Sequence, residues 1–256
     1  MTKIIAIANQ KGGVGKTTTA VNLSAALAEA GKKVLMADLD PQGNTTSGLG
    51  CAVNERNSIY DVLMGRARLE DCIQKTGQKR LKLVGSDIRL AGAEVELVSM
   101  EEREFYLKKV LGPAREEYDY ILVDCPPSLS LLTLNALAAA DSVLIPIQCE
   151  YYALEGVTSL MNTINRVKRT FNPHLEIEGI LLTMLDGRTN LGLQVVDQVK
   201  KHFKKAVFAT MIPRNVRLGE APSHGKPINQ YDPKSTGAVA YQALAKEVLA
   251  RNKGKK

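Results

Sequence analysis

The sequence predicts an α/β fold in which a mostly parallel, twisted β-sheet carries helices on both faces. Short apolar runs rich in β-branched residues alternate with stretches of helical periodicity along all 256 residues. The apolar runs are continuous, which is typical of strands that are buried on both faces. No Pro/Ser-rich linker or low-complexity block divides the chain. We therefore expect one domain over residues 1–256, with a flexible tail at 252–256.

The expected elements follow this alternation in chain order, and the intervening helices provide the crossovers that parallel strand pairs need. The predicted strands are Ile4–Ala8, Val34–Asp38, Leu81–Val84, Tyr120–Asp124, Ser142–Pro146, Ile177–Leu182 and Val207–Ile212. The predicted helices are Thr17–Ala30, Glu101–Glu117, Leu131–Ala139, Ala153–Thr170, Leu191–Phe203 and Gly237–Arg251.

Composition limits the class of protein. The four cysteines are far apart and form no C-x-x-C pair, so neither a zinc ribbon nor a disulfide scaffold is indicated. The start of the chain has no signal-peptide pattern. The longest apolar region, Leu129–Ile147, is interrupted by Asn135, Asp141 and Pro146, and it is too polar to span a membrane. We expect a cytoplasmic protein.

The first predicted strand runs into a glycine-rich turn, and a helix follows at once. A strand, a turn of this kind and a helix form the context of a phosphate-binding loop, in which backbone N–H groups and the helix N-terminus face an anion. Lys16 would reach the β- and γ-phosphates, and the Thr17 hydroxyl would bind Mg²⁺. The motif therefore predicts a P-loop NTPase. The expected nucleotide-binding residues are Lys11, Gly12, Gly13, Val14, Gly15, Lys16, Thr17 and Thr18.

The loop departs from the common pattern, because Gln10 holds the place of the first glycine and a second lysine, Lys11, lies inside the loop. K-G-G-V-G-K-T-T resembles the deviant Walker-A ATPases, which include ParA, MinD and the nitrogenase iron protein. The resemblance implies that Lys11 crosses a dimer interface and contacts the nucleotide of the partner subunit, so Lys11 and Lys16 are expected catalytic residues. A turn that only packs a helix on a strand, or a dinucleotide site, fits less well, since G-x-G-x-x-G is absent.

Acidic residues end two of the predicted strands, at the edge of the sheet where ligands bind. Asp38-Leu39-Asp40-Pro41-Gln42 follows the second strand. In the resembled family, the second acid of D-x-D-P-Q positions the attacking water, which implies a catalytic role and a place near the metal for Asp40. Asp38 is expected to support the loop or the water shell of Mg²⁺. An alternative is that Asp40-Pro41 only opens a turn.

Ile121-Leu122-Val123-Asp124 is a Walker-B pattern, in which a buried strand delivers one carboxylate to the metal's water shell. Asp124 is therefore an expected Mg²⁺ residue, beside Thr17 and Asp40. A third loop follows the last predicted strand. The resemblance implies that adenine contacts Pro213, Arg214 and Asn215 there, whereas the residues alone indicate only an Arg/Asn loop, which an ordinary surface loop would also explain.

The resemblance narrows in the second half of the chain. Residues 145–156 and 183–193, I-P-R-N-V-R-L at 212–218 and A-P-S-H-G-K-P-I at 221–228 are similar to the short chromosomal ParA proteins of the Soj type. The likeness covers residues 3–250. It implies ATP and Mg²⁺ as cofactors, a homodimer formed on ATP binding, a ParB-type partner that stimulates hydrolysis, and non-specific binding of double-stranded DNA through Arg188 and Arg217.

The charge distribution agrees with a polyanion partner. The net charge is +7, but residues 188–256 hold 14 basic and four acidic residues, while residues 1–187 hold 20 basic and 23 acidic residues. A basic surplus confined to the last quarter suggests a polyanion partner, although an ordinary solvated surface would also explain it; the resemblance implies that this partner is DNA and that the protein is nucleoid-associated. Lys200, Lys201, Lys204 and Lys205 either add to this surface or only face water.

The resemblance implies an ATP-driven partition switch, whose ATP-bound dimer binds DNA and whose hydrolysis releases it. Three other functions fit the sequence less well. A MinD-like ATPase at a membrane surface would need a C-terminal amphipathic anchor, but Gly237–Arg251 is diluted by alanines, so no stable membrane anchor is expected. An electron-transfer relative of the nitrogenase iron protein would need paired cluster cysteines, and Cys125 has no obvious mate. A DNA-binding scaffold with an inactive nucleotide site would not need the full set of Lys16, Thr17, Asp40 and Asp124.

Overall fold

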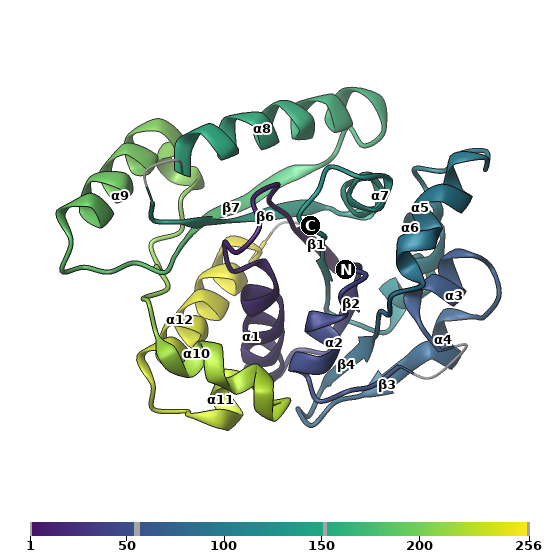
Figure 1. The fold of residues 1–256 in the computed structure, drawn as a ribbon, viewed down its shortest axis with the longest axis horizontal. Coiled ribbons are helices and arrows are strands. Elements are labelled where there is room, and N and C mark those ends of the chain that lie inside the picture. The colour runs from purple at the N-terminus through teal and green to yellow at the C-terminus, as the bar shows by residue number, and fades with distance from the viewer. Residues whose placement is uncertain (1, 54–56, 151–152, 255–256) are drawn as a thin grey trace.

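The computed structural model describes residues 2–53, 57–150 and 153–254, and its centre is a seven-stranded sheet (Figure 1). The strands lie in the order β3-β4-β2-β5-β1-β6-β7. All neighbours are parallel except β3, which pairs antiparallel with β4 at one edge. The predicted fold class is confirmed. The strands are β1 (Lys3–Ile7), β2 (Val34–Asp38), β3 (Ile73–Lys75), β4 (Leu81–Val84), β5 (Tyr120–Asp124), β6 (Ser142–Gln148) and β7 (Glu176–Thr183).

Helices cover both faces of the sheet. Figure 1 shows α1 and α12 side by side on one face, while α7 and α8 lie on the other. The α-helices are α1 (Lys16–Glu29), α2 (Asn44–Gly48), α3 (Ile59–Leu63), α4 (Leu69–Cys72), α5 (Leu90–Val98), α6 (Tyr106–Leu111), α7 (Leu131–Ala139), α8 (Ala153–Thr170), α9 (Asn190–Phe203), α10 (Val216–Glu220), α11 (Ile228–Tyr231) and α12 (Thr236–Arg251). Short 3₁₀ segments are η1 (Pro113–Glu116), η2 (Lys204–Ala206) and η3 (Ala221–His224).

The sheet separates two hydrophobic cores. Ile4 and Ala6 of β1 join the core beneath α3 and α5–α8, whereas Ile5 and Ile7 join the core beneath α1 and α12. All four side chains are at most 1% exposed. Successive strand residues point to opposite faces, so a strand that is apolar at every position is explained by burial on both sides. Burial of each of the three isoleucine side chains contributes about 1.5–3 kcal/mol relative to leaving it exposed.

The predicted strand Val207–Ile212 is wrong. This segment follows β7 through isolated bridges only, which join Val207 to Ile180 and Pro213 to Leu185. Side chains of α12 take the main-chain groups that a strand would pair: Glu247 accepts from the N–H groups of Ala209 and Thr210, at 2.9 and 3.0 Å. The Arg251 guanidinium donates to the carbonyl of Val207 at 2.9 Å. The N–H groups of Phe208 and Ile212 do bond to carbonyls of β7, at 2.9 and 2.8 Å, but the bonds to α12 between them interrupt the ladder.

The predicted helix Glu101–Glu117 is also wrong in extent. The chain forms α6 and then η1, because Gly112-Pro113 interrupts the helical pattern and Glu102 has a φ of 50°. The edge strand β3 and the helix α5 had no counterpart among the predicted elements. Among the described residues, no helix is long and apolar enough to cross a membrane. Of the predicted tail, Asn252 donates to Glu178 at 2.6 Å, and residues 255–256 lie outside the described ranges.

Candidate nucleotide-binding and catalytic site

The loop between β1 and α1 has the backbone shape of a phosphate cradle. Gly13 and Gly15 have φ values of 73° and 87°, in the left-handed region that favours glycine, and α1 begins directly after Gly15. Side chains brace the loop from neighbouring strands. Asn9 donates to the Pro146 carbonyl at 2.7 Å, and the Thr183 hydroxyl donates to the Val14 carbonyl at 2.8 Å. The N-terminus of α1 and the loop N–H groups are thus held in place for an anion.

Lys16, the first residue of α1, is 6% exposed. Its ammonium donates to the carbonyl of Lys11 at 3.2 Å. Burial lowers the pKa of Lys16, and the nearby charges of Asp124 and Asp40 partly oppose this shift. The Lys16 ammonium forms no ion pair within 4.0 Å in the described part of the chain, so a phosphate could become its direct counter-ion.

Asp124 ends β5 and is fully buried beside the loop. One of its oxygens accepts hydrogen bonds from the hydroxyls of Thr17 at 2.9 Å and Thr45 at 2.7 Å. The other oxygen, Oδ1, is buried and has no partner among the described residues. Burial, and then the charge of Asp38, raise the pKa of Asp124 to about 7. Carboxylate and hydroxyl oxygens are the hard ligands that Mg²⁺ prefers, so Asp124 and Thr17 fit such an ion.

Asp38 and Asp40, which flank Leu39, have different surroundings. Asp38 is fully buried, and its Oδ2 accepts from the N–H and hydroxyl of Thr46 at 2.8 and 2.7 Å. Its Oδ1 accepts from the N–H of Asp40 at 3.2 Å. Asp40 is 8% exposed and accepts from the N–H of Gln42 at 3.0 Å through one oxygen. The second oxygen of Asp40 accepts no hydrogen bond from the described part of the chain, so it can hold a water.

A cavity of about 350 Å³ adjoins the loop, on the side of α1 that faces the segment after residue 212. Pro213, Arg214 and Asn215 line it, together with Gly15 and Thr18 of the loop. The predicted adenine residues therefore lie beside the predicted phosphate residues. The other lining residues are Thr183, Met184, Ile212, Val216, Leu218, Gly219 and Tyr241. The volume is at the lower end of the range of small-molecule sites.

Asn215 has a structural task in this cavity. Its side-chain oxygen accepts from the N–H of Arg217 at 2.8 Å, which caps α10, and its side-chain nitrogen donates to the Thr236 hydroxyl at 2.7 Å. The amide is thereby fixed in one orientation. A second N–H and a second lone pair remain for a ligand.

Sequence reasoning missed several residues of the site. Thr45 and Thr46 follow the D-L-D-P-Q motif by only a few positions, so the motif could have indicated them. Thr183 and Tyr241 come from β7 and α12, far along the chain, and no local pattern marks them. Tyr241 is 1% exposed, and its hydroxyl lies 3.2 Å from that of Thr19. The contact joins α12 to α1 at the floor of the cavity.

The Lys11 side chain lies on the exposed side of the loop before α1, with its ammonium 3.7 Å from a carboxylate oxygen of Glu150. The two side chains are 42% and 47% exposed. A solvent-exposed ion pair of this kind contributes about 0–1 kcal/mol. The lysine can therefore exchange Glu150 for another anion at little cost.

The two arginines expected to contact DNA lie outside the cavity and are held by acids. The Arg188 side chain is 89% exposed, and it donates two hydrogen bonds to Asp186, at 2.9 and 2.8 Å. These bonds lower the pKa of Asp186 to about 2. Arg217 donates to Glu220 at 2.8 Å and lies 3.6 Å from Asp232. Both cations are exposed, and each has a local counter-ion.

Comparison with known proteins adds to this geometry. The family model described as an AAA domain matches residues 2–177. The chain is 59% identical to the sporulation initiation inhibitor protein Soj of Bacillus subtilis over 98% of this chain and 99% of that protein. It is 55% identical to the chromosome partitioning protein ParA of Myxococcus xanthus, over 98% and 89% of the two chains. It is 53% identical to the chromosome-partitioning ATPase Soj of Treponema pallidum, over 98% and 99%.

Solved structures of P-loop proteins have the same fold. A Mycobacterium smegmatis protein, described as cobyrinic acid a,c-diamide synthase with bound ATP analogue and magnesium, is 38% identical with a TM-score of 0.88. The match covers 100% of this chain and 98% of that one. The cell division ATPase MinD of Pyrococcus furiosus is 27% identical with a TM-score of 0.81, over 98% and 99% of the two chains.

Proposed function

The chain belongs to the Soj/ParA family of chromosome-partitioning ATPases, and we propose that it works as a switch whose ATP-bound homodimer holds double-stranded DNA. The observation that carries this proposal is the set of groups gathered around one cradle: the buried Lys16, the unpartnered oxygen of Asp124 and the open oxygen of Asp40. A nucleotide-free scaffold would have no use for an unpaired buried carboxylate oxygen, which is costly to maintain.

The catalytic roles follow from these surroundings. The loop N–H groups and the Lys16 ammonium bind the β- and γ-phosphates and stabilise the charge that develops on the transferred phosphoryl group. Thr17 and Asp124 would hold Mg²⁺, with Asp40 close to its water shell, and the ion would neutralise phosphate charge. Asp40 orients the attacking water through its open oxygen. Asp38 holds Asp40 and Thr46 in position and touches neither water nor phosphate. Pro213, Arg214 and Asn215 enclose the adenine.

Dimerisation would place a second P-loop opposite the first. Gly12 is exposed, and a Cβ built on it meets no atom within 4 Å, so this edge of the loop is open for a partner subunit. The Lys11 side chain then leaves its exposed ion pair with Glu150 and reaches the nucleotide of the partner subunit. There its ammonium places a positive charge beside the γ-phosphate. The site is thus complete only in the dimer.

The DNA contacts would come from Arg188 and Arg217. Each lies in or just after a loop beyond the nucleotide site, and neither is part of a base-reading motif. Exposed arginines contact phosphates, which carry no sequence code, so binding is expected to be similar on every DNA sequence. Such binding would associate the protein with the nucleoid. Their pairing with Asp186 and Glu220 means that DNA phosphates must compete with these carboxylates.

A ParB-type protein is the proposed partner that accelerates hydrolysis, and family membership supports this part. Hydrolysis removes the γ-phosphate that Lys11 of the other subunit contacts. The dimer then loses a charge pair at its centre, and the two DNA-binding surfaces separate. Release of DNA follows because two weak phosphate-binding surfaces act together only while they are joined.

A MinD-like role at a membrane surface is the second candidate, and one observation disfavours it. The apolar residues Leu244 and Val248 of α12 are fully buried in the core beneath α1, and Val239 is the one large apolar side chain of this helix that is largely exposed. A helix that binds in the membrane interface presents its apolar face to lipid. The apolar face of α12 is instead occupied by the sheet and α1.

The test is DNA binding by Arg188→Ala and Arg217→Ala in the presence of Mg·ATP, measured by fluorescence anisotropy on two unrelated duplexes at several salt concentrations. Each variant should bind more weakly on both duplexes, and the slope of log affinity against log salt should fall by about one unit. ATP-driven dimerisation should be unchanged.

Arg68→Ala is the matched control, because Arg68 is also exposed and donates two hydrogen bonds to a carboxylate, that of Asp71, at 3.0 and 3.1 Å. Its loss should leave DNA affinity unchanged. Unaltered DNA binding by an Arg188/Arg217 double variant would contradict the proposal.

A further inference from the structure

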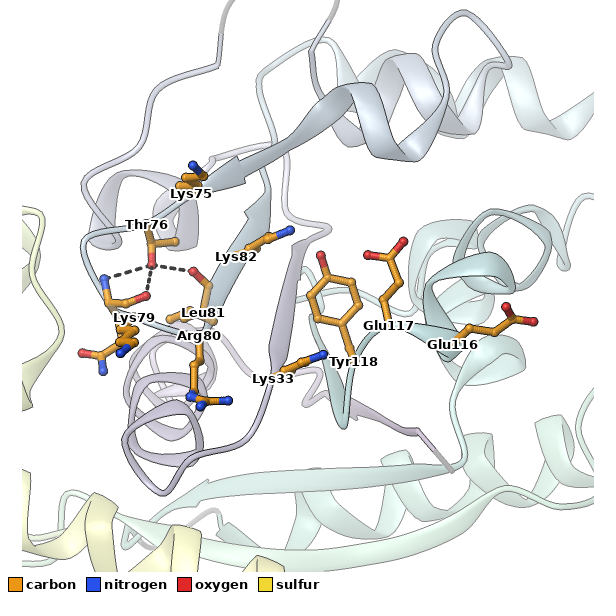
Figure 2. A pocket seen from close by; sticks show the side chains of 11 residues that line it. Lys33, Lys75, Thr76, Lys79, Arg80, Leu81, Lys82, Glu116, Glu117 and Tyr118 are labelled. Atoms are coloured by element: carbon orange, nitrogen blue, oxygen red, sulfur yellow. Dashed lines mark hydrogen bonds between the residues drawn. The ribbon is translucent and has the colours of Figure 1, made fainter.

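A second cavity, of about 590 Å³, lies at the amino ends of the parallel strands, whereas the nucleotide site lies at their carboxyl ends (Figure 2). Lys33 directly precedes β2, Arg80 directly precedes β4, and Tyr118 lies two residues before β5. The carboxyl ends of β2 and β5 carry Asp38 and Asp124, so the amino ends of these parallel strands are at the other edge. The volume falls in the range of small-molecule sites.

The lining of this cavity is strongly basic. Its five cationic residues are exposed, and none forms an ion pair with another residue in the described ranges. Glu116 and Glu117 are the acidic lining residues, and Figure 2 shows them on the other side of the Tyr118 ring from Lys82. The cations are Lys33, Lys75, Lys79, Arg80 and Lys82. Like charges in a concave site attract an anion, because the field adds up there.

Tyr118 provides an independent sign of a missing ligand. It is 7% exposed, and its hydroxyl is buried without a hydrogen-bond partner in the described part of the chain. The Lys82 ammonium lies 5.8 Å from the centre of the Tyr118 ring. Burial raises the pKa of Tyr118 to about 12, so the hydroxyl remains a neutral donor at physiological pH. Buried hydroxyls are normally paired, and an anionic oxygen in the cavity would pair this one.

The wall that carries the cations is held by main-chain hydrogen bonds. The N–H of Val34 donates to the Arg80 carbonyl at 2.9 Å, and the N–H of Asp119 donates to the Lys33 carbonyl at 2.8 Å. The Thr76 hydroxyl spans the turn before β4 with further bonds, drawn in Figure 2. Arg80 has a φ of 66°, a left-handed conformation that costs a non-glycine residue free energy. The backbone positions that carry the cations are therefore set before any ligand arrives, while the exposed side chains can adjust to it.

We propose that this cavity binds a small molecule carrying two or more phosphate groups, separately from the nucleotide in the P-loop. The unpaired cations bind the phosphates. The Tyr118 hydroxyl is buried in the free protein, and it donates to one phosphate oxygen once the exposed Lys82 side chain turns from the ring toward the ligand. Leu81 and the face of the Tyr118 ring give the apolar floor that organic phosphates contact. Duplex DNA fits this site less well, because it needs an extended surface rather than a pocket. This site does not depend on the proposed partition function.

In the experiment, inorganic pyrophosphate is titrated into full-length protein that has been saturated with Mg·ADP. Isothermal titration calorimetry measures the binding at low and at moderate salt. The wild-type protein should bind pyrophosphate at one site, more weakly at the higher salt. Tyr118→Phe and Lys82→Gln should each weaken binding about three- to tenfold. Arg80→Gly should weaken it similarly without lowering the melting temperature, because glycine relieves the left-handed strain while it removes the charge.

Two further variants separate this site from other anion sites. Lys32→Gln makes the same charge change next to Lys33, but Lys32 lines a different cavity and should keep full pyrophosphate affinity. Lys16→Ala disables the P-loop, so it is titrated without ADP, and it should keep its pyrophosphate affinity as well. The proposal is overturned if ADP-loaded wild type binds no pyrophosphate, if Lys32→Gln loses as much affinity as Lys82→Gln, if only Lys16→Ala loses it, or if Tyr118→Phe binds as wild type does.

Discussion

Gly12→Val tests whether two P-loops face each other in the ATP-bound protein. Within one chain the substitution should be harmless. Gly12 is exposed, its φ lies outside the left-handed range, and a Cβ there meets no atom within 4 Å. The free energy of unfolding should therefore change by about 0.5 kcal/mol or less. ATP affinity should stay within about threefold of wild type, since the inward-facing N–H groups and Lys16 are untouched.

In the dimer the same substitution is expected to be severe. A close contact between subunits that must accept extra branched carbons weakens the free energy of dimerisation by about 1–3 kcal/mol. In a two-fold symmetric dimer both subunits carry the substitution, so the effect occurs twice. The sum of roughly 2–6 kcal/mol corresponds to a dimer that is on the order of 30- to 10⁴-fold weaker. Sedimentation velocity with Mg·ATP measures it directly, and an Asp40→Ala background prevents hydrolysis during the run.

Two other glycines provide controls for this experiment. Gly187→Val adds an equally unobstructed side chain away from the P-loop and should leave the dimer intact. Gly15→Val should damage nucleotide binding and stability together, because its φ of 87° is left-handed. A Gly12→Val protein that dimerises with wild-type affinity would refute the facing-loop geometry. Loss of ATP binding by Gly12→Val would show that the residue belongs to the cradle itself.

Two further substitutions test the switch. Asp40→Ala should bind Mg·ATP and dimerise while hydrolysis slows about 10²- to 10⁴-fold; phosphate release measures the rate, and wild-type turnover would move the water-orienting role to another residue. Asp186→Asn should strengthen DNA binding about three- to tenfold at low salt, because it frees the Arg188 guanidinium from its counter-ion. Anisotropy with Mg·ATP measures the gain, and unchanged affinity would mean that Arg188 does not contact phosphate.

Much of the sheet could be predicted because its signals are local. The bounds of the strands Val34–Asp38, Leu81–Val84 and Tyr120–Asp124 agree with the structure, since each is a compact apolar run ended by a polar residue or a turn. The bounds of the helix Leu131–Ala139 agree as well. The segment Val207–Ile212 has an equally apolar pattern, yet it forms no strand. Two of its N–H groups bond to the Glu247 side chain of α12, and the sequence pattern does not reveal which distant side chain will compete for a backbone group.

The site also contains residues that the sequence could predict and residues that it could not. Lys16, Thr17 and Asp124 come from motifs whose spacing fixes the chemistry, and the structure brings them together around one cradle. Asp38 and Asp40 have different surroundings, and the roles expected for them from D-x-D-P-Q stay predictions. Thr183 could not be found from sequence, because a threonine at the end of a buried strand is unremarkable until the fold places it against Val14.

The basic cavity could not be predicted from the sequence either. Lys33, Arg80 and Tyr118 are separated widely in the sequence and belong to no motif. They meet only because β2, β4 and β5 are neighbours that begin at the same edge of the sheet. Charge counted along the chain pointed instead to the last quarter, and it missed a cluster that the topology assembles from the first half.

The most direct test of the switch is DNA affinity measured with ADP, with ATP and with a non-hydrolysable ATP analogue, each with Mg²⁺ and at two salt concentrations. We predict strong, salt-sensitive DNA binding with ATP and with its analogue. Binding should persist with the analogue but decline with ATP as it is hydrolysed. With ADP or without nucleotide, little binding is expected. Equal affinity in all nucleotide states would contradict the coupling of ATP, dimer and DNA on which the proposed function depends.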